Sequence, residues 1–114
     1  MNDRETLELA AHACGLLWRW NEQFGLVERY SPDSTEDSCI KWMAWKPGID
    51  NGDCADMETA LEIDVRWRGN YVECMVANSP ECAMEYFDEH AEDKAAARRM
   101  ASLKVAAEIG KGIP

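Results

Sequence analysis

The chain has 114 residues, enough for one hydrophobic core and too few for two ordinary domains, so we expect a single domain over residues 1–114. Its 46% hydrophobic content is that of a folded protein and argues against a disordered chain. The 22 acidic and 12 basic residues give a formal net charge of −10, which argues against direct binding to nucleic acid and favours a basic protein partner.

Cysteine and histidine spacing argues against a disulfide framework and a structural metal. The five cysteines are odd in number and form no C-x-x-C pair, and the two histidines add no zinc-ligand spacing. Reduced thiols in a cytoplasm fit this pattern. The sequence shows no export signal and no run of about 18 apolar residues, so we expect no membrane insertion.

The first half of the chain predicts a helix, a hairpin and a further strand. Apolar residues at three- and four-residue spacing predict a helix over 3–15. Alternation then predicts a hairpin over 16–30, the polar stretch 31–38 predicts an exposed loop, and 39–45 again alternates like a strand. Large apolar groups lie on both sides of that strand, so it is either covered on both faces or presents an aromatic face to a partner.

The second half begins with a short helix that Asp53 caps and that runs to about Glu62. Two alternating stretches, 63–67 and 71–77, surround a Gly-Asn turn and predict a second hairpin. Residues 83–87 predict one more strand.

A long C-terminal helix completes the predicted elements. Asp88 caps it, it runs to about Ile109, and Gly110 ends it. The full order is αββ(β)αββ(β)α, which predicts an α+β fold in which an antiparallel sheet of about four to six strands packs against a few helices. The predicted buried stripe of the long helix is Ala96, Met100, Leu103 and Ala107.

Two acidic stretches without Lys or Arg, 47–64 and 81–93, could meet a basic partner. The spacing of the first does not match a calcium loop, and acids in the first turn of a helix also complement the helix dipole. Helix capping and solubility are therefore the alternatives to binding. The candidate partner-binding residues are Glu81, Glu85, Glu89, Asp50, Asp53, Asp56 and Trp45.

The five tryptophans, at positions 18, 20, 42, 45 and 67, have two possible roles. Such rings dominate burial in small domains, so packing in the core and on the sheet faces is the main expectation. Tryptophan is also enriched among binding hot spots, so an interface role for one or two of them is the alternative.

Catalytic machinery is not evident. Cys14 with His12, or Cys82 with His90, would be a nucleophile beside a base, but residues two apart on a helix do not face each other. No phosphate-binding loop or dinucleotide motif occurs. We therefore expect no enzyme, no catalytic residue, no cofactor and no metal, with a small hydrolase or thiol enzyme as the alternative.

Three segments carry a resemblance: NDRETLELAA at 2–11, WKPGIDNGD at 45–53, and KVAAEIGK at 104–111 with Arg99 before it. In their order and spacing they resemble a group of small uncharacterised proteins of tailed phages and prophages of proteobacteria. In that group the middle segment reads W-N-P-L-x-D-D-G-D and the last reads like R-A-A-A-E-I-G-K. The resemblance implies a phage origin and no particular mechanism. The departures from the middle pattern are Lys46, Gly48, Ile49 and Asn51.

Charge and resemblance together give the leading hypothesis. It is a phage accessory protein in the cytoplasm of the host bacterial cell that binds a host protein with a basic surface and restrains it, for example a defence protein or another nucleic-acid-handling protein. The alternative is a phage maintenance or assembly protein whose acidity serves only solubility. The sequence leaves a homodimer open.

Overall fold

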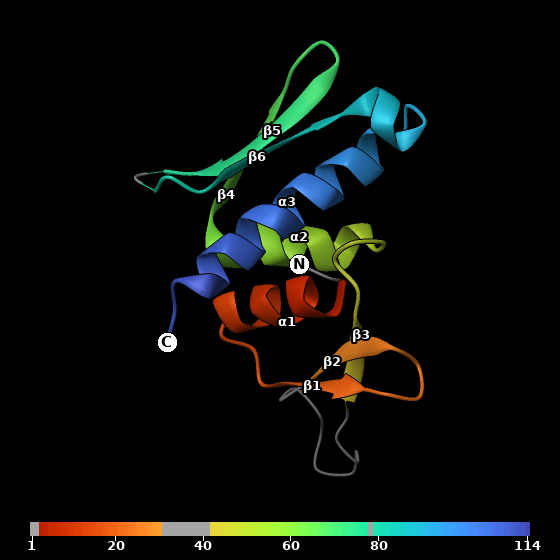
Figure 1. Cartoon of the computed structure of the whole chain (residues 1–114), viewed down its shortest axis with the longest axis vertical. Helices are drawn as coiled ribbons and strands as arrows, with labels where there is room; N and C mark the ends of the chain where they lie inside the picture. The colour runs from red at the N-terminus through yellow and green to blue at the C-terminus, as the bar shows by residue number, and fades with distance from the viewer. Residues whose placement is uncertain (1–2, 31–41, 78) are drawn as a thin grey trace.

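The computed structural model describes residues 3–30, 42–77 and 79–114 and measures 49 × 31 × 26 Å. The helices form a middle layer, with one three-stranded sheet at each end of the molecule (Figure 1). In chain order the elements are α1 (Asp3–Ala13), β1 (Trp18–Asn21), β2 (Leu26–Tyr30), β3 (Trp42–Trp45), α2 (Asn51–Leu61), β4 (Ile63–Trp67), β5 (Tyr71–Val76), β6 (Cys82–Tyr86), the 3-10 helix η1 (Phe87–His90) and α3 (Lys94–Lys111).

The first sheet has the order β1-β2-β3 and is antiparallel throughout. Its register pairs Val27 with Trp20 on one side and with Trp45 on the other, so the three side chains share one face. This face packs against the buried alanines Ala10 and Ala11 of α1. Small helix residues opposite large strand residues allow α1 to lie close to the sheet.

The second sheet has the order β4-β5-β6 and is also antiparallel. The β4–β5 hairpin agrees with the predicted one, and its register pairs Ile63 with Val76. Strand alternation places Ile63, Val72 and Cys74 on one face, where they are buried against Ala101 and Val105 of α3.

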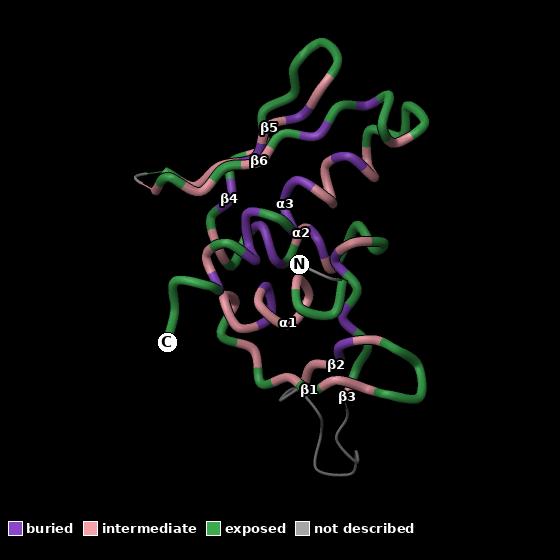
Figure 2. Tube along the Cα trace, viewed as in Figure 1, coloured by how far each residue is buried: buried purple, intermediate pink, exposed green. Residues whose placement is uncertain are grey.

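Helix α3 takes part in both hydrophobic cores. Leu103 and Ala106 belong to the core with α1 and the first sheet, whereas Ala97, Ala101 and Val105 belong to the core with the second sheet. Buried positions therefore recur along most of α3 (Figure 2). A helix that is apolar on two sides is buried between two layers, and this explains the position of α3 between the two sheets.

Gly110 lies inside α3 at its crossing with α1. A Cβ atom at this position would be 2.0 Å from the carbonyl oxygen of Leu9, so only glycine allows the two backbones to approach this closely. The expectation that Gly110 ends the helix is wrong, because α3 continues to Lys111.

The α+β class is confirmed, and the expectation of one sheet is wrong. Both strands left optional in the predicted order form, and a 3-10 helix is added before α3. Two sheets result because the strands of each half of the chain pack against a different side of the helical layer. The predicted loop 31–38 and residues 39–41 of a predicted strand lie outside the described residues.

Two helix starts and one buried stripe also differ from expectation. Asp50, not Asp53, caps α2 by accepting a hydrogen bond from the Asp53 backbone N–H at 2.8 Å. Asp93, not Asp88, caps α3, because η1 occupies residues 87–90. In the predicted stripe of α3, Leu103 and Ala107 are buried while Ala96 and Met100 are half-buried.

Candidate functional site

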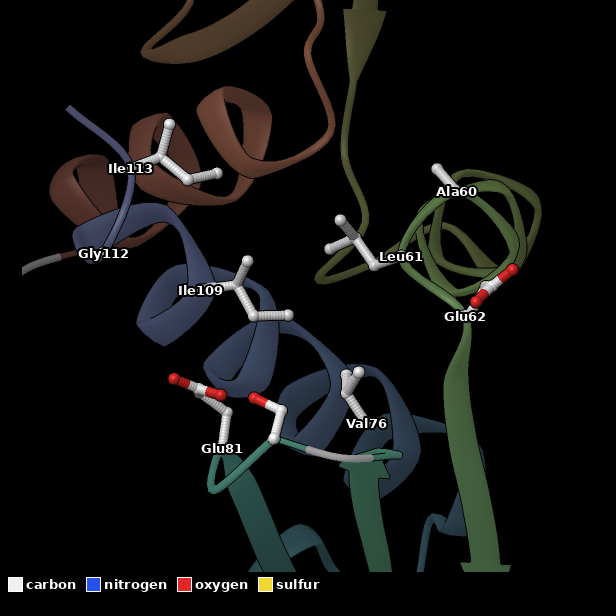
Figure 3. Close-up of a pocket in the computed structure, with 9 residues that line it drawn as sticks. Ala60, Leu61, Glu62, Val76, Glu81, Ile109, Gly112 and Ile113 are labelled. Atoms are coloured by element: carbon white, nitrogen blue, oxygen red, sulfur yellow. The ribbon is translucent and has the colours of Figure 1, made fainter.

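A cleft of about 440 Å³ lies where the C-terminal ends of α2 and α3 meet the second sheet (Figure 3). The end of α2 supplies one side, and the connection between β5 and β6 supplies the other. We name it the α2–α3 cleft. Its lining residues are Ala60, Leu61, Glu62, Val76, Ser79, Glu81, Ile109, Gly112 and Ile113.

The middle of the cleft is apolar. Leu61, Val76 and Ile109 are partly buried against the core of the second sheet, and each keeps part of its side chain at the cleft. Ile113 is 40% exposed beside them. An apolar surface of this kind gains free energy when a partner removes it from water, at about 25 cal/mol per Å² of apolar area.

Glu62 lies at one side of the cleft, in a backbone conformation that is uncommon for its residue type. It is the C-cap of α2, with φ 55° and ψ 45°, where glycine is usual. Its backbone N–H donates to the carbonyls of Glu58 and Thr59, which ends the helix. The left-handed conformation costs about 1 kcal/mol for a residue with a side chain.

Glu81 lies on the opposite side, just before β6, with Leu61, Val76 and Ile109 between the two carboxylates (Figure 3). Within residues 3–30, 42–77 and 79–114, neither Glu62 nor Glu81 forms an ion pair. Each acidic stretch of the sequence thus contributes one unpaired carboxylate to the same cleft. This arrangement suits a ligand with an apolar centre and a cation on each side.

Two of the predicted partner-binding residues are not at the surface. Trp45 is 3% exposed and belongs to the first core, so its role is packing. Glu85 is 7% exposed, and its carboxylate accepts hydrogen bonds from Lys104 Nζ at 2.7 Å and His90 Nε2 at 2.9 Å. Sequence alternation puts Glu85 on the inner face of β6, opposite Val72, and this is why it is buried.

The pKa of Glu85 reflects the balance of these surroundings. Burial raises the pKa of this carboxyl, but the hydrogen bonds and positive charges of Lys104 and His90 lower it more, so the net pKa lies below its ordinary value. Glu85 therefore holds β6 to α3 as an ion and is not available to a partner.

The other predicted partner-binding residues lie at α2 or in η1, outside the α2–α3 cleft. Asp50 caps α2, and the Asp53 carboxylate accepts a hydrogen bond from the Lys46 backbone N–H at 2.8 Å. Asp56 is exposed in the first half of α2, and Glu89 is exposed in η1. Of the predicted set, only Glu81 lines the α2–α3 cleft.

A buried polar cluster joins α2 to α3 and was not foreseen from the sequence. Glu58 is 6% exposed and forms a bidentate ion pair with Arg98, with an Nε–Oε2 distance of 3.0 Å and a second bond from Nη2. Ser102 Oγ donates to the same carboxylate at 2.5 Å, and Cys54 Sγ approaches it at 3.7 Å. Because Glu58 and Arg98 are 40 residues apart, no local spacing indicates their pairing.

Burial disfavours the reactive thiolate form of Cys14, Cys54 and Cys74. Burial, with the nearby negative charge of Glu58, raises the pKa of Cys54 to about 12, and burial raises the pKa of Cys74 and of Cys14 to about 11. The histidine proposed for Cys14, His12, instead has its Nε2 3.1 Å from the Ile113 carbonyl.

The described residues show neither a metal-binding cluster nor a membrane-spanning helix. They contain no group of three or more His, Cys, Asp or Glu side chains placed to hold a metal ion. No helix among them is both long enough and apolar enough to span a bilayer. No protein family, curated protein or solved structure matches this chain.

Proposed function

We propose that this protein acts by binding, and that the α2–α3 cleft receives a basic segment of another protein. The observation that carries the proposal is the cleft itself, in which apolar side chains lie between the unpaired carboxylates of Glu62 and Glu81. A partner segment with one apolar side chain between two Arg or Lys residues would match this pattern.

The energetics of such a contact divide into two parts. The apolar centre contributes to the affinity, because a side chain placed there leaves water. The flanking carboxylates attract cations and orient the segment, and rim charges of this kind act mainly on the association rate and on its salt dependence. The net charge of −10 strengthens the attraction to any basic protein.

The sequence hypothesis of a phage accessory protein defines the class of partner that we propose. The three resembling segments support a phage origin, and the acidic surface favours host proteins with basic grooves, such as nucleic-acid-handling or defence proteins. A protein that holds a basic segment bordering such a groove would restrain its target by excluding nucleic acid. The raised pKa values of Cys14, Cys54 and Cys74 argue against a nucleophilic role for these three thiols.

A comparison of two charge-reversed double variants tests the cleft. In Glu62→Lys/Glu81→Lys both cleft carboxylates are reversed. In the control, Asp56→Lys/Glu89→Lys, two exposed acids outside the cleft are reversed, so the net charge changes by the same amount. Wild type and both variants are used as bait in host lysate, and the retained proteins are quantified by mass spectrometry.

We expect the control to retain the same proteins as wild type and the cleft variant to lose those with basic surfaces. Purified partner then allows association rates to be measured at low and moderate salt, where the cleft variant should associate more slowly and with weaker salt dependence. Equal retention by wild type and the cleft variant would refute the proposed site. Equal loss in both variants would show that overall acidity, and not this cleft, governs binding.

A further inference from the structure

The second sheet has one face that no described element covers. Helix α3 packs on one face of the sheet, and the other face is turned away from the helical layer (Figure 1). The register of β4, β5 and β6 gives the residues of this uncovered side, which we name the open face. They are Asp64, Arg66, Tyr71, Glu73, Met75, Cys82, Met84 and Tyr86, with Arg68 beside them in the β4–β5 turn.

The open face carries more large apolar side chains than a solvated sheet face usually does. Antiparallel sheets with one solvated face normally carry polar residues there. Here the outward positions of β5 and β6 include Tyr71, Met75, Met84 and Tyr86. Met84 is 48% exposed, Tyr86 is 40% exposed, and the two tyrosine rings lie 5.4 Å apart. Tyrosine, methionine and arginine are the residue types enriched at the centres of protein interfaces.

The charges on the open face balance, although the chain as a whole has a net charge of −10. Arg66 pairs with Asp64 at 3.0 Å, and Arg68 lies 3.9 Å from Glu73. A basic partner gains no net attraction on this face. An acidic molecule would be repelled by the rest of the protein surface, which carries the excess negative charge. On the open face it meets no net negative charge, so this face repels it least.

We propose that the open face binds the open face of a second copy of this chain. A patch whose charges are already balanced within one chain can meet a second copy of itself across a two-fold axis without net charge repulsion at the contact. Two sheets packed in this way would lie about 10 Å apart, with the tyrosine and methionine side chains between them. None of the residues that line the α2–α3 cleft belongs to this surface.

Salt should affect this dimer in a characteristic direction. Two chains that each carry −10 repel each other, and salt shortens the range of that repulsion from about 30 Å at 0.01 M to about 8 Å at 0.15 M. The dimer should therefore become tighter as salt is added. Binding of a basic segment in the cleft should become weaker over the same range, so the two proposals fail or succeed independently.

Sedimentation velocity of the full chain over a range of concentrations tests the proposal at both salt levels. The variant Met84→Lys introduces a charge in the middle of the open face. Its lysine lies opposite Glu73 in the register, so the strand pair tolerates it. It also lowers the net negative charge, so a weaker dimer cannot be attributed to greater repulsion. The control is Leu17→Lys, which makes the same charge change at an exposed apolar residue away from the second sheet.

We expect wild type and Leu17→Lys to dimerise alike, and Met84→Lys to dimerise roughly tenfold more weakly, the loss usual for a buried interface anchor. Tyr86→Lys gives a second test should Met84→Lys fail to fold, as judged by thermal unfolding. Wild type that stays monomeric at all concentrations and both salt levels overturns the proposal. The proposal is also overturned if the dimer is weakened by Leu17→Lys and is unchanged in Met84→Lys and Tyr86→Lys.

Discussion

Replacing Gly110 with alanine should separate α1 from α3 and destabilise the protein. The added Cβ would lie 2.0 Å from the carbonyl oxygen of Leu9 and 2.7 Å from its carbonyl carbon. Both atoms belong to the backbone of α1, so no side-chain rotation relieves the clash. The helix must instead retreat by more than an ångström to restore ordinary contact.

The expected free-energy change is the sum of a gain and a larger loss. Alanine is favoured over glycine within a helix by about 1 kcal/mol, which stabilises the variant. Forcing extra volume into a packed interface costs about 1–3 kcal/mol, and the rigid backbone contact at this site places Gly110→Ala at the upper end. The net loss is about 2 kcal/mol, and this corresponds to a fall in Tm of roughly 8 °C for a domain of this size.

Urea unfolding followed by tryptophan fluorescence measures this loss, because Trp18 and Trp20 pack against the core that contains α1. Gly112→Ala is the matched control. A Cβ there would have its nearest neighbour at an ordinary 3.5 Å, and the backbone is right-handed, so we expect a change within about 0.5 kcal/mol. If Gly110→Ala were as stable as wild type, the close crossing of the two helices would be refuted.

Three further predictions concern other parts of the molecule. Glu62→Gly should raise the free energy of unfolding, measured by urea denaturation, by about 1 kcal/mol, because glycine accepts a positive φ. The same variant should retain less partner from the lysate, because it lacks one of the two cleft carboxylates. Glu85→Gln should cost about 2 kcal/mol at pH 7, and this cost should shrink only as the pH falls below 4.5 and through the lowered pKa of Glu85. Burial raises the pKa of Glu85 but its cationic neighbours lower it more, so ionised Glu85 stabilises the fold above the ordinary pKa of 4.5 and that contribution falls away with acid. In native protein at pH 8, diluted until it is monomeric, iodoacetamide should modify exposed Cys82 well before buried Cys54 and Cys74, as peptide mass spectrometry would show.

Local patterns in the sequence were sufficient to predict most elements of the fold. The β4–β5 hairpin follows from alternation around a Gly-Asn turn, and α1 follows from its apolar spacing. Helix starts were predicted less well, because several acids compete for each cap. Asp50 and Asp53 are both capable N-caps, and only the path of the preceding turn decides that Asp50 is used.

The features that the sequence did not reveal depend on contacts between distant residues. Gly110 looks like a helix terminator until α1 is placed across it. Glu85 looks exposed until strand register turns it toward Lys104. The α2–α3 cleft combines Glu62 and Glu81, each from a different acidic stretch, and nothing in the linear spacing of those acids distinguishes these two from the rest.

The packing of α1 on α3 also has a consequence for the speed of folding. The contact between His12 and the Ile113 carbonyl closes a loop of 101 residues. The conformational entropy of this loop must be lost before α1 gains any stabilisation from α3. Proteins rich in such non-local contacts fold in milliseconds to seconds, not in microseconds. Helix α1 and the first sheet should therefore be the last parts to dock, and a newly made chain would expose their apolar faces until α3 is in place.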